Sequence, residues 1–435
     1  MTHRPPLPGG PYLVVGLARS GVAVALALRA RGEAVVGVDA GAPDVGRLAQ
    51  AGVEVHLDDS GVDLLERTAT LVKSPGVPHE APVVEAARAR GIPLVGELEL
   101  AWRLLPNELV AVTGTNGKTT TTELIGHVHR EAGLPVAVAG NVGTAVASLV
   151  DEVAPEATIV CEASSFQLED TTAFAPEAAV LLNITPDHLD RHGSLVAYRE
   201  AKLNAFRRQG PDAIAVVPVD MAVPGAARRV SFGEGGEMRL DGETLTWQAE
   251  PFMRAEEICL PGPHNRENAM AAAAVCLARG VDPDAVRAGL RTFRGVAHRL
   301  EPVAERDGVA YVNDSKATNV GSTLVALRSY APRRVRLILG GRTKAQDFAP
   351  LAPLVAERCA GVYLIGEGAA EIAAALEAAG VPLHACGELE RALADASAAA
   401  RPGEVVLLSP ACASFDQFPD FEARGDAFRA LVEAL

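Results

Sequence analysis

The chain has 435 residues, of which 49% are hydrophobic and 22% are charged. At roughly 150 residues per domain, this length predicts about three domains and a core that needs neither disulfides nor a structural metal. Lys and Arg number 40 against 55 Asp and Glu, and the net charge of −15 disfavours a general nucleic-acid or anionic-membrane surface. An anionic ligand must therefore bind at a local cluster of positive charge.

The positive charge is unevenly composed, because only five of the 40 cationic residues are lysines. They are Lys73, Lys118, Lys202, Lys316 and Lys344. In such an Arg-rich chain, a retained lysine can mark a site that needs a point charge or a primary amine. Chance survival during codon drift is the alternative.

Cysteine usage and the N-terminal segment indicate the compartment. The six cysteines are scattered, with no C-x-x-C pair and no His cluster at zinc spacing, which is typical of a reducing environment. The segment MTHRPPLPGGPYLVVGLARS lacks the apolar run and cleavage site of a signal peptide, and no uninterrupted apolar stretch reaches about 20 residues. We therefore expect a cytoplasmic protein without membrane contact.

Three series of short apolar strands and Ala-rich helices follow one another. The first includes YLVVG, AVVGVD and LVKSPGVP, the second opens with ELVAVTG, and the third opens with GVAYVNDS. This alternation predicts parallel, doubly wound sheets. Residues 230–260 differ, because alternating polar and apolar residues with Gly-rich turns predict hairpins appended to the second series. We predict an α/β fold with three domains, at 1–96, 97–296 and 297–435.

The N-terminal turn Gly16-Leu17-Ala18-Arg19-Ser20-Gly21 is similar to a dinucleotide-binding fingerprint, with Ala18 at its middle glycine position. Asp39 ends the next strand. This pattern would indicate a nicotinamide-dependent oxidoreductase, but that hypothesis leaves the motif in the middle of the chain unexplained.

That motif is the segment ELVAVTGTNGKTTTTELIGHVHR, in which a strand leads through a Gly-rich loop into a helix. Glycines let backbone N–H groups close around phosphate, and the start of the helix adds partial positive charge. Lys118 can reach the β- and γ-phosphates, and Thr119 can ligate Mg²⁺. Val112 stands where the common P-loop has its first glycine, so the loop is a shortened variant. The predicted nucleotide site comprises Gly114, Thr115, Asn116, Gly117, Lys118, Thr119 and Thr120.

Polar residues also follow the neighbouring strands of the second series. Asn141 follows VAVAG, Glu162 ends ATIVCE, and His188 follows AAVLLNIT. The carboxyl ends of parallel strands are where ligands bind. Glu162 could therefore share Mg²⁺ with Thr119, and His188 is a candidate ligand of a second ion. Taken one at a time, such residues are more often ordinary surface or core residues, so the metal hypothesis depends on their common position beside the loop.

Lys202 lies in the helical segment AYREAKLNAF. A surface lysine is the ordinary interpretation, although this chain uses Arg freely at such positions. An amine that loses its proton can react with CO₂ to form a carbamate, which would act as a carboxylate ligand.

The third series has polar clusters after its strands as well, in NDSKATN, GGRTK and SPACASFD. Lys316 and Lys344 supply positive charge for an anionic substrate or phosphate, and Thr318 and Ser414 supply hydroxyl groups. Cys412 has no His in a comparable motif, so we interpret it as a buried bystander rather than a nucleophile.

Taken together, the motifs resemble those of the Mur ligase family over essentially the whole chain. The segments are GTNGKTT, ASSFQLE, NITPDHLDRH, AKLNAF, GPHNRENAMAA, HRLE, NDSKATN and LSPACASFDQF, and the last three are similar to those of its D-glutamate-adding members. The resemblance implies an N-terminal Rossmann-like domain for a UDP-sugar, a central P-loop-type ATPase domain, and a C-terminal Rossmann-like domain that closes over the site.

The resemblance also implies a reaction. An ATP-dependent ligase would add D-glutamate to UDP-N-acetylmuramoyl-L-alanine through an acyl phosphate, in peptidoglycan precursor synthesis. A ligase for another amino acid, or one that extends folate with glutamate, is the alternative that SPACASFDQF disfavours. A phosphotransferase or GTPase is disfavoured by the shortened loop and the missing Asn/Thr-Lys-x-Asp motif. The implied cofactors are ATP, two Mg²⁺ ions and a CO₂-derived carbamate on Lys202, and we expect a monomer that binds no nucleic acid.

The family's residue roles carry over by motif. The catalytic and metal-binding residues would be Lys118, Thr119, Glu162, His188 and Lys202. Further ATP contacts would be Asn268, Arg299, Asp314 and Lys316. The UDP-sugar contacts would be Arg19, Ser20, Asn141 and Gln167, to which the scarcity of lysine adds Lys73. The D-glutamate contacts would be Thr318, Lys344, Ser414, Phe415 and Phe421.

Overall fold

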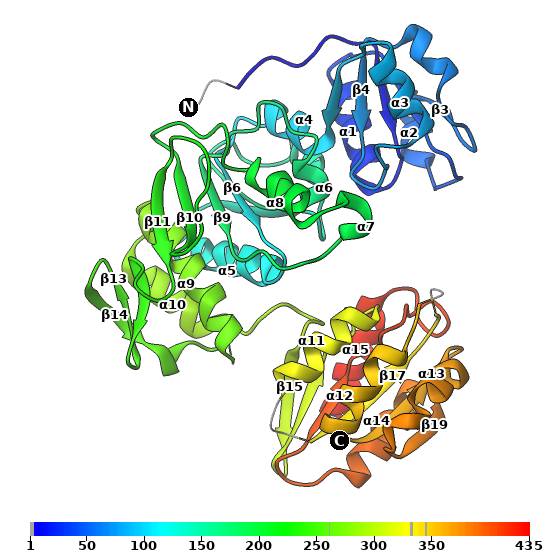
Figure 1. Ribbon diagram of the computed structural model, residues 1–435, viewed down its shortest axis with the longest axis vertical. Coiled ribbons are helices and arrows are strands. Elements are labelled where there is room, and N and C mark those ends of the chain that lie inside the picture. Colours follow the sequence, from blue (N-terminus) through cyan, green and yellow to red (C-terminus); the bar gives the residue numbers. More distant parts are fainter. Residues whose placement is uncertain (1–3, 261, 331–333, 344–345) are drawn as a thin grey trace. The chain divides into compact units, whose positions relative to one another are not determined.

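The computed structural model describes residues 4–260, 262–330, 334–343 and 346–435, apart from the side chain of Asp190. It divides into two compact units, Met1–Phe293 and Arg294–Leu435, and each is an α/β structure (Figure 1). Within the described residues, none of the helices combines the length and the apolar character needed to cross a membrane.

The first sheet is formed by five parallel strands in the order β3-β2-β1-β4-β5. The strands are β1 (Tyr12–Val15), β2 (Val35–Val38), β3 (Glu54–His56), β4 (Thr70–Lys73) and β5 (Leu94–Gly96). The helices are α1 (Arg19–Ala30), α2 (Gly46–Gln50), α3 (Pro82–Ala89) and α4 (Glu97–Leu104), with a 3₁₀ turn at Asp63–Arg67. Every residue of β1 is buried, which explains its uninterrupted apolar sequence.

The central sheet has nine strands in the order β14-β13-β12-β11-β10-β9-β6-β8-β7. The strands are β6 (Leu109–Thr113), β7 (Val136–Gly140), β8 (Thr158–Glu162), β9 (Ala178–Leu181), β10 (Ile214–Pro218), β11 (Arg228–Phe232), β12 (Met238–Asp241), β13 (Thr244–Trp247) and β14 (Glu250–Arg254). Strands β6 to β12 pair in parallel, whereas β12, β13 and β14 pair antiparallel. The hairpins predicted for this region are therefore present.

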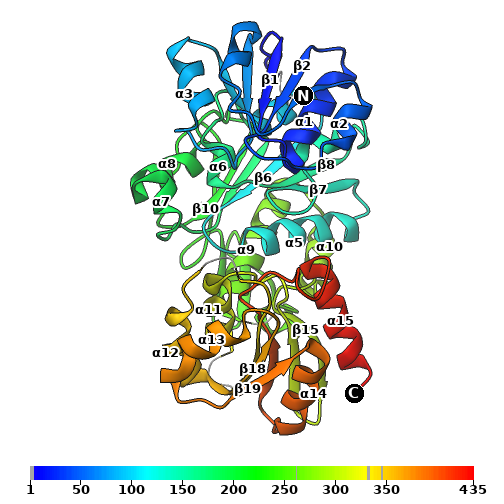
Figure 2. The same ribbon diagram turned by 90° about the vertical axis from the view of Figure 1, so that its right-hand side faces the viewer.

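Helices cover both faces of the central sheet. They are α5 (Lys118–Glu131), α6 (Ser165–Leu168), α7 (Leu189–His192), α8 (Leu195–Leu203), α9 (Pro263–Ala278) and α10 (Pro283–Thr292), with 3₁₀ turns at Val146–Leu149 and Ala255–Glu257. Helices α5, α9 and α10 pack against one another on one side, and α6 and α8 lie on the other (Figures 1 and 2). Strand β6 lies between β8 and β9, so the strand order reverses there, and ligands bind at such reversal points.

One hydrophobic cluster runs through both sheets of the first unit. It contains Val14 of the first sheet, Trp102 of α4, and Ala111 and Ala179 of the central sheet. The ring of Trp102 packs edge-on against Phe174, with centroids 5.6 Å apart. This shared core accounts for the two sheets forming one compact unit, and the predicted boundary between residues 96 and 97 stays a prediction.

The second unit has a six-stranded sheet in the order β15-β16-β20-β17-β18-β19, in which only β15 is antiparallel to its neighbour. The strands are β15 (Glu301–Arg306), β16 (Val309–Asn313), β17 (Val335–Gly340), β18 (Cys359–Ile365), β19 (Leu383–Gly387) and β20 (Val405–Leu408). The helices are α11 (Val320–Ser329), α12 (Ala352–Arg358), α13 (Ala369–Leu376), α14 (Leu389–Ala399) and α15 (Phe421–Glu433), with 3₁₀ turns at Ala349–Leu351 and Glu377–Ala379. Two separate core clusters contain alternate residues of β17 and β18, as expected for a sheet with helices on both faces.

Candidate active site

The Gly-rich loop between β6 and α5 is held by Asn183, the second residue after β9. The backbone N–H of Thr115 donates to the Asn183 carbonyl oxygen at 2.9 Å, and that of Asn116 donates to Asn183 Oδ1 at 2.9 Å. The Asn183 amide donates back to the Asn116 carbonyl oxygen at 3.1 Å. Asn183 therefore fixes the loop, a role that the sequence analysis missed, although the residue stands at a strand end.

Gly117 must be glycine for two reasons. Its φ is 85°, and a Cβ there would lie 2.2 Å from Oδ1 of Asn268. A side chain would thus be strained and would also collide with α9. The buried Asn268, predicted to contact ATP, therefore packs directly against the loop.

Two lysines converge on one carbonyl oxygen of the loop. Lys118 Nζ donates to the carbonyl oxygens of Gly114 at 3.0 Å and Thr115 at 2.8 Å, and Lys202 Nζ donates to that of Gly114 at 2.8 Å. Lys202 Nζ also lies 4.4 Å from the centroid of the Tyr198 ring, and the Tyr198 hydroxyl donates to Thr115 Oγ1 at 3.2 Å. Tyr198 is a second residue that the sequence analysis did not select.

The environment of Lys202 favours its neutral form. The residue is only 1% exposed, and burial, followed by the charge of Lys118, lowers its pKa from 10.5 to about 7. A pKa this low leaves a substantial fraction of the amine unprotonated at neutral pH. As an ammonium group it cannot ligate a cation, whereas a carbamate on the same nitrogen could.

The oxygen donors predicted for Mg²⁺ lie at adjacent strand ends. Glu162 ends β8, where it is in register with Val112 of β6, and Thr119 lies in the first turn of α5. Both are buried. Asn141 donates to Glu162 Oε1 at 3.1 Å. One hydroxyl and one carboxylate oxygen form a donor set that suits Mg²⁺, so these residues fit the ion that the sequence predicts.

His188 precedes α7 in a left-handed conformation, with φ of 51°. Its side chain is 49% exposed, and its ring centroid lies 4.9 Å from that of Phe166 and 6.4 Å from that of Tyr198. His188 and Lys202, predicted to share an ion, therefore both contact Tyr198.

The N-terminal turn is held by hydrogen bonds to the side chain of Asp39. Asp39 accepts hydrogen bonds from the backbone N–H groups of Leu17 at 2.6 Å and Gly41 at 2.9 Å. Its two carboxylate oxygens thus stabilise the turn, which accounts for this acid without nicotinamide chemistry. Arg19 is exposed and donates to the Gly143 carbonyl oxygen at 2.7 Å, while Ser20 is half-buried in the first turn of α1.

Two of the predicted UDP-sugar residues have internal partners. Lys73 is 0% exposed, with Nζ 2.8 Å from Asp170 Oδ2. Gln167 is buried, accepts from the backbone N–H of Ser164 at 3.0 Å, and donates to Glu97 Oε1 at 3.0 Å. Burial raises the pKa of Glu97. These contacts give Lys73 and Gln167 structural roles, and their ligand roles stay predictions.

The second unit gathers the other predicted ATP contacts at the end of β16. Asp314 is buried and accepts from the backbone N–H of Leu300 at 3.1 Å and from Ser409 Oγ at 2.8 Å. Burial raises its pKa to about 7, a rise that the positive charges of Arg299 and Lys316 oppose. The three predicted residues Arg299, Asp314 and Lys316 are therefore close enough to interact electrostatically.

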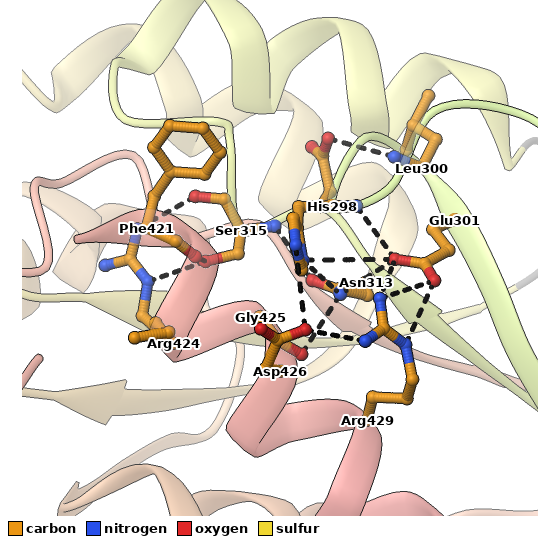
Figure 3. A network of polar contacts seen from close by, with 12 residues as sticks. His298, Leu300, Glu301, Asn313, Ser315, Phe421, Arg424, Gly425, Asp426 and Arg429 are labelled. Carbon is orange, nitrogen blue, oxygen red and sulfur yellow. Dashed lines mark hydrogen bonds and ion pairs between the residues drawn. The ribbon is translucent and has the colours of Figure 1, made fainter. Parts of the chain in front are cut away.

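A buried arginine connects the segments predicted to bind D-glutamate. Arg424 donates from Nε to Ser315 Oγ at 2.9 Å and from Nη2 to the Ser315 carbonyl oxygen at 2.9 Å (Figure 3). Its Nη2 also donates to the carbonyl oxygen of Cys412 at 3.1 Å. Ser315 Oγ donates in turn to the Phe421 carbonyl oxygen at 2.8 Å. Arg424 is a third residue that the sequence analysis missed, because it donates largely to backbone carbonyl oxygens, which no motif marks.

The same close-up shows a second network beside it. The His298 ring lies edge-on to that of Phe421 at 6.2 Å, and its Nδ1 is 3.0 Å from Asn313 Nδ2. Glu301 accepts hydrogen bonds from Asn313 at 3.0 Å and Arg429 at 2.9 Å. These contacts fix the start of α15, where Phe421 stands.

The remaining predicted D-glutamate residues differ in exposure. Ser414 is buried, Thr318 is half-buried and Phe415 is 60% exposed, all in the second unit. Lys344 lies outside the described residues.

Comparison with known proteins places these sites in a family. The models of the MurD-like N-terminal domain, the Mur ligase middle domain and the glutamate ligase domain match residues 11–96, 112–276 and 298–412. A UDP-N-acetylmuramoylalanine–D-glutamate ligase from Pelotomaculum thermopropionicum is 44% identical over 444 residues, covering 97% of both chains. The chain belongs to the Mur ligase family. The predicted α/β class with N-terminal, middle and C-terminal Mur ligase domains is thereby confirmed.

Solved Mur ligases share this fold. UDP-N-acetylmuramate-alanine ligase from Thermotoga maritima aligns over 97% of this chain and 99% of its own, with a TM-score of 0.60 and 20% identity. MurF ligase from the same organism, solved in complex with ADP, aligns over 92% and 95%, with a TM-score of 0.56 and 17% identity.

Proposed function

We propose that this Mur ligase joins D-glutamate to UDP-N-acetylmuramoyl-L-alanine, with conversion of ATP to ADP and phosphate. The observation that carries the proposal is the arrangement at the ends of β6 and β8, where a phosphate-type loop and Lys118 lie beside the oxygen donors Thr119 and Glu162. The identities of amino acid and acceptor follow the name of the 44% identical relative.

The first step is activation of a carboxylate, which is a poor electrophile. An oxygen of the acceptor's terminal carboxylate attacks the γ-phosphorus, the bond to the β,γ-bridging oxygen breaks, and ADP leaves. Lys118 and the start of α5 stabilise the negative charge that gathers on the transferring phosphoryl group. Mg²⁺, when bound by Thr119 and Glu162, would neutralise more of it.

The second step forms the amide bond. The unprotonated amino group of D-glutamate attacks the acyl carbon, its proton is released, and phosphate leaves with the electrons of the broken C–O bond. We assign Thr318, Lys344, Ser414, Phe415 and Phe421 to D-glutamate. We assign Asn268, Arg299, Asp314 and Lys316 to ATP. We assign Arg19, Ser20, Lys73, Asn141 and Gln167 to the sugar nucleotide.

A carbamate on Lys202 would complete a second ion site with His188. The neutral amine bonds to the carbon of CO₂ and releases a proton, which leaves an anionic carbamate. The pKa of about 7 supports this reaction, because a substantial fraction of the amine is unprotonated at neutral pH. An anion near Glu162 requires a cation, so carbamate and metal would stabilise each other.

Phosphate release from ATP tests the function. The assay combines the protein, UDP-N-acetylmuramoyl-L-alanine, Mg²⁺ and, in turn, D-glutamate, L-glutamate, L-lysine and meso-diaminopimelate. We expect release only with D-glutamate, from a monomer in solution. Phosphate release that does not increase when D-glutamate is added, or that increases with L-lysine or meso-diaminopimelate, would contradict the proposed specificity.

The two converging lysines give a matched test of the carbamate. Both Lys202→Ala and Lys118→Ala should abolish activity, because the first removes the nitrogen that would carry the carbamate and the second removes the positive charge beside the transferring phosphoryl group. Millimolar short-chain carboxylates should partly restore Lys202→Ala and leave Lys118→Ala inactive. Equal behaviour of the two variants, together with an unmodified Lys202 in the active protein, would count against the carbamate.

A further inference from the structure

Arg191 of α7 holds a loop that belongs to the first sheet. Its Nη2 donates to the carbonyl oxygens of Val77 at 2.9 Å and Pro75 at 3.3 Å, both in the loop after β4. The same nitrogen donates to Glu169 Oε1 at 3.0 Å. The guanidinium carbon lies 4.9 Å from the centroid of the Phe166 ring, which supports the group from one side.

The short helix that carries Arg191 begins directly after His188. Its four residues need tertiary anchors, because isolated turns of helix are unstable in water. The second anchor is His192, whose ring stacks on Phe166 at 5.3 Å and whose Nε2 is 3.0 Å from Ser165 Oγ. His188 itself has φ of 51°, a conformation that surrounding contacts must hold. The position of His188 therefore depends on the anchors of α7.

The loop held by Arg191 continues to the predicted sugar-nucleotide turn. Ser74 Oγ donates to the Gly16 carbonyl oxygen at 2.7 Å, and a Cβ added at Gly16 would lie 2.7 Å from Cγ2 of Val77. This turn leads into α1 and its residues Arg19 and Ser20. A continuous series of contacts thus joins that turn, through the loop after β4, to Arg191.

A metal site is the alternative use for the neighbouring acids. Donor atoms of His79, Glu169 and Asp170 lie within 4.8 Å of one another. However, Lys73 Nζ is 2.8 Å from Asp170 and Arg191 Nη2 is 3.0 Å from Glu169. Two cations already balance the two carboxylates, and a divalent ion would be repelled by both. The cluster is therefore better suited to holding the two sheets together than to binding a metal.

We propose that Arg191 is a positioning residue that couples sugar-nucleotide binding at the first sheet to the placement of His188. The inference rests on the function proposed above. Substrate contacts at the Gly16 turn order the loop after β4, the loop orders Arg191 and α7, and α7 sets His188. Binding of the sugar nucleotide should then tighten binding of Mg²⁺, and linkage requires Mg²⁺ to tighten binding of the sugar nucleotide by the same factor.

Calorimetry on the full chain tests this coupling directly. The Kd of UDP-N-acetylmuramoyl-L-alanine is measured with a non-hydrolysable ATP analogue present, with and without Mg²⁺. For the wild type we expect Mg²⁺ to lower this Kd by about fivefold or more, and in Arg191→Met we expect the factor to fall towards one. Arg191→Lys, which keeps a charge for Glu169 but lacks the planar face against Phe166, should give an intermediate factor.

A control variant and a replacement variant complete the test. Arg207→Met removes another arginine that pairs with a glutamate, Glu200, but belongs to an exposed pair, and should retain the wild-type factor. If Arg191→Met does not fold, Glu169→Gln replaces it, because that change weakens the same anchor and should also reduce the factor. A wild-type factor in the folded Arg191 or Glu169 variant overturns the inference. A wild-type protein that binds no UDP-N-acetylmuramoyl-L-alanine refutes the proposed function instead.

Discussion

Replacement of Lys73 by methionine should strongly destabilise the first unit. The ammonium group is fully buried, with Asp170 Oδ2 at 2.8 Å, and the change leaves that carboxylate buried without its cation. Removing one partner of a buried ion pair costs about 3–5 kcal/mol. Asp170 keeps His79, whose Nε2 is 2.8 Å from Oδ1, so we expect a loss at the lower end of this range, about 3 kcal/mol.

Tryptophan fluorescence during urea unfolding measures this loss. Both tryptophans, Trp102 and Trp247, belong to the first unit, so the signal follows that unit alone. With a slope of about 3 kcal/mol per molar, the midpoint should fall by about 1 M urea. Arg207→Met, which breaks an exposed pair with Glu200, should lower the free energy of unfolding by no more than about 1 kcal/mol.

A double variant separates the ion pair from simple loss of packing. Lys73→Met combined with Asp170→Asn removes both charges and should regain much of the stability lost in Lys73→Met. The reasoning is refuted if Lys73→Met shifts the midpoint no more than the exposed control does. It is also refuted if the free-energy changes of the two single variants add up in the double variant, because coupled residues are not additive.

Three further predictions concern single groups. At constant dissolved CO₂, the initial rate of carbamate formation on Lys202 should follow the unprotonated amine and rise with a midpoint near pH 7, and a rate still rising steeply at pH 9 would contradict the pKa of about 7. Gly117→Ala should raise the KM for ATP by about tenfold, since the new Cβ meets Asn268, and an unchanged KM would show that the loop accommodates it. The Asp314 carboxyl keeps its proton up to about pH 7 in the folded state but loses it near pH 4 in the unfolded state. The second unit should therefore lose stability as the pH rises from about 4 to about 7. Asp314→Asn should abolish that loss in calorimetry, and the same pH dependence in this variant would contradict the assignment.

Local patterns predicted the strand, the Gly-rich loop and the helix of residues 109–131. The strand, loop and helix of residues 109–131 follow from an apolar run, glycines and a helix-forming segment, and all three signals lie within one stretch of chain. The rule that ligands bind at the carboxyl ends of parallel strands also brought Asn141 and Glu162 together correctly, since strand pairing places those ends side by side.

Contacts between distant segments could not be predicted in the same way. The scarcity of lysine marked Lys73 as unusual, but its partner Asp170 lies in another domain-sized segment and carries no motif that points back to it. Arg191 and Arg424 were missed for a similar reason, because each donates largely to backbone carbonyl oxygens, which every residue offers. Only the folded chain shows which carbonyl groups are within reach.

The strand order of the central sheet also governs when the loop can form during synthesis. Strand β6 pairs with β9, which the ribosome delivers only after β7 and β8, whereas the first sheet ends at Gly96. Because non-local pairing is slow, the strands of the first sheet can pair while β6 still lacks β9. A nascent chain that stops before Asn183 would therefore carry a Gly-rich loop without the hydrogen bonds that Asn183 supplies.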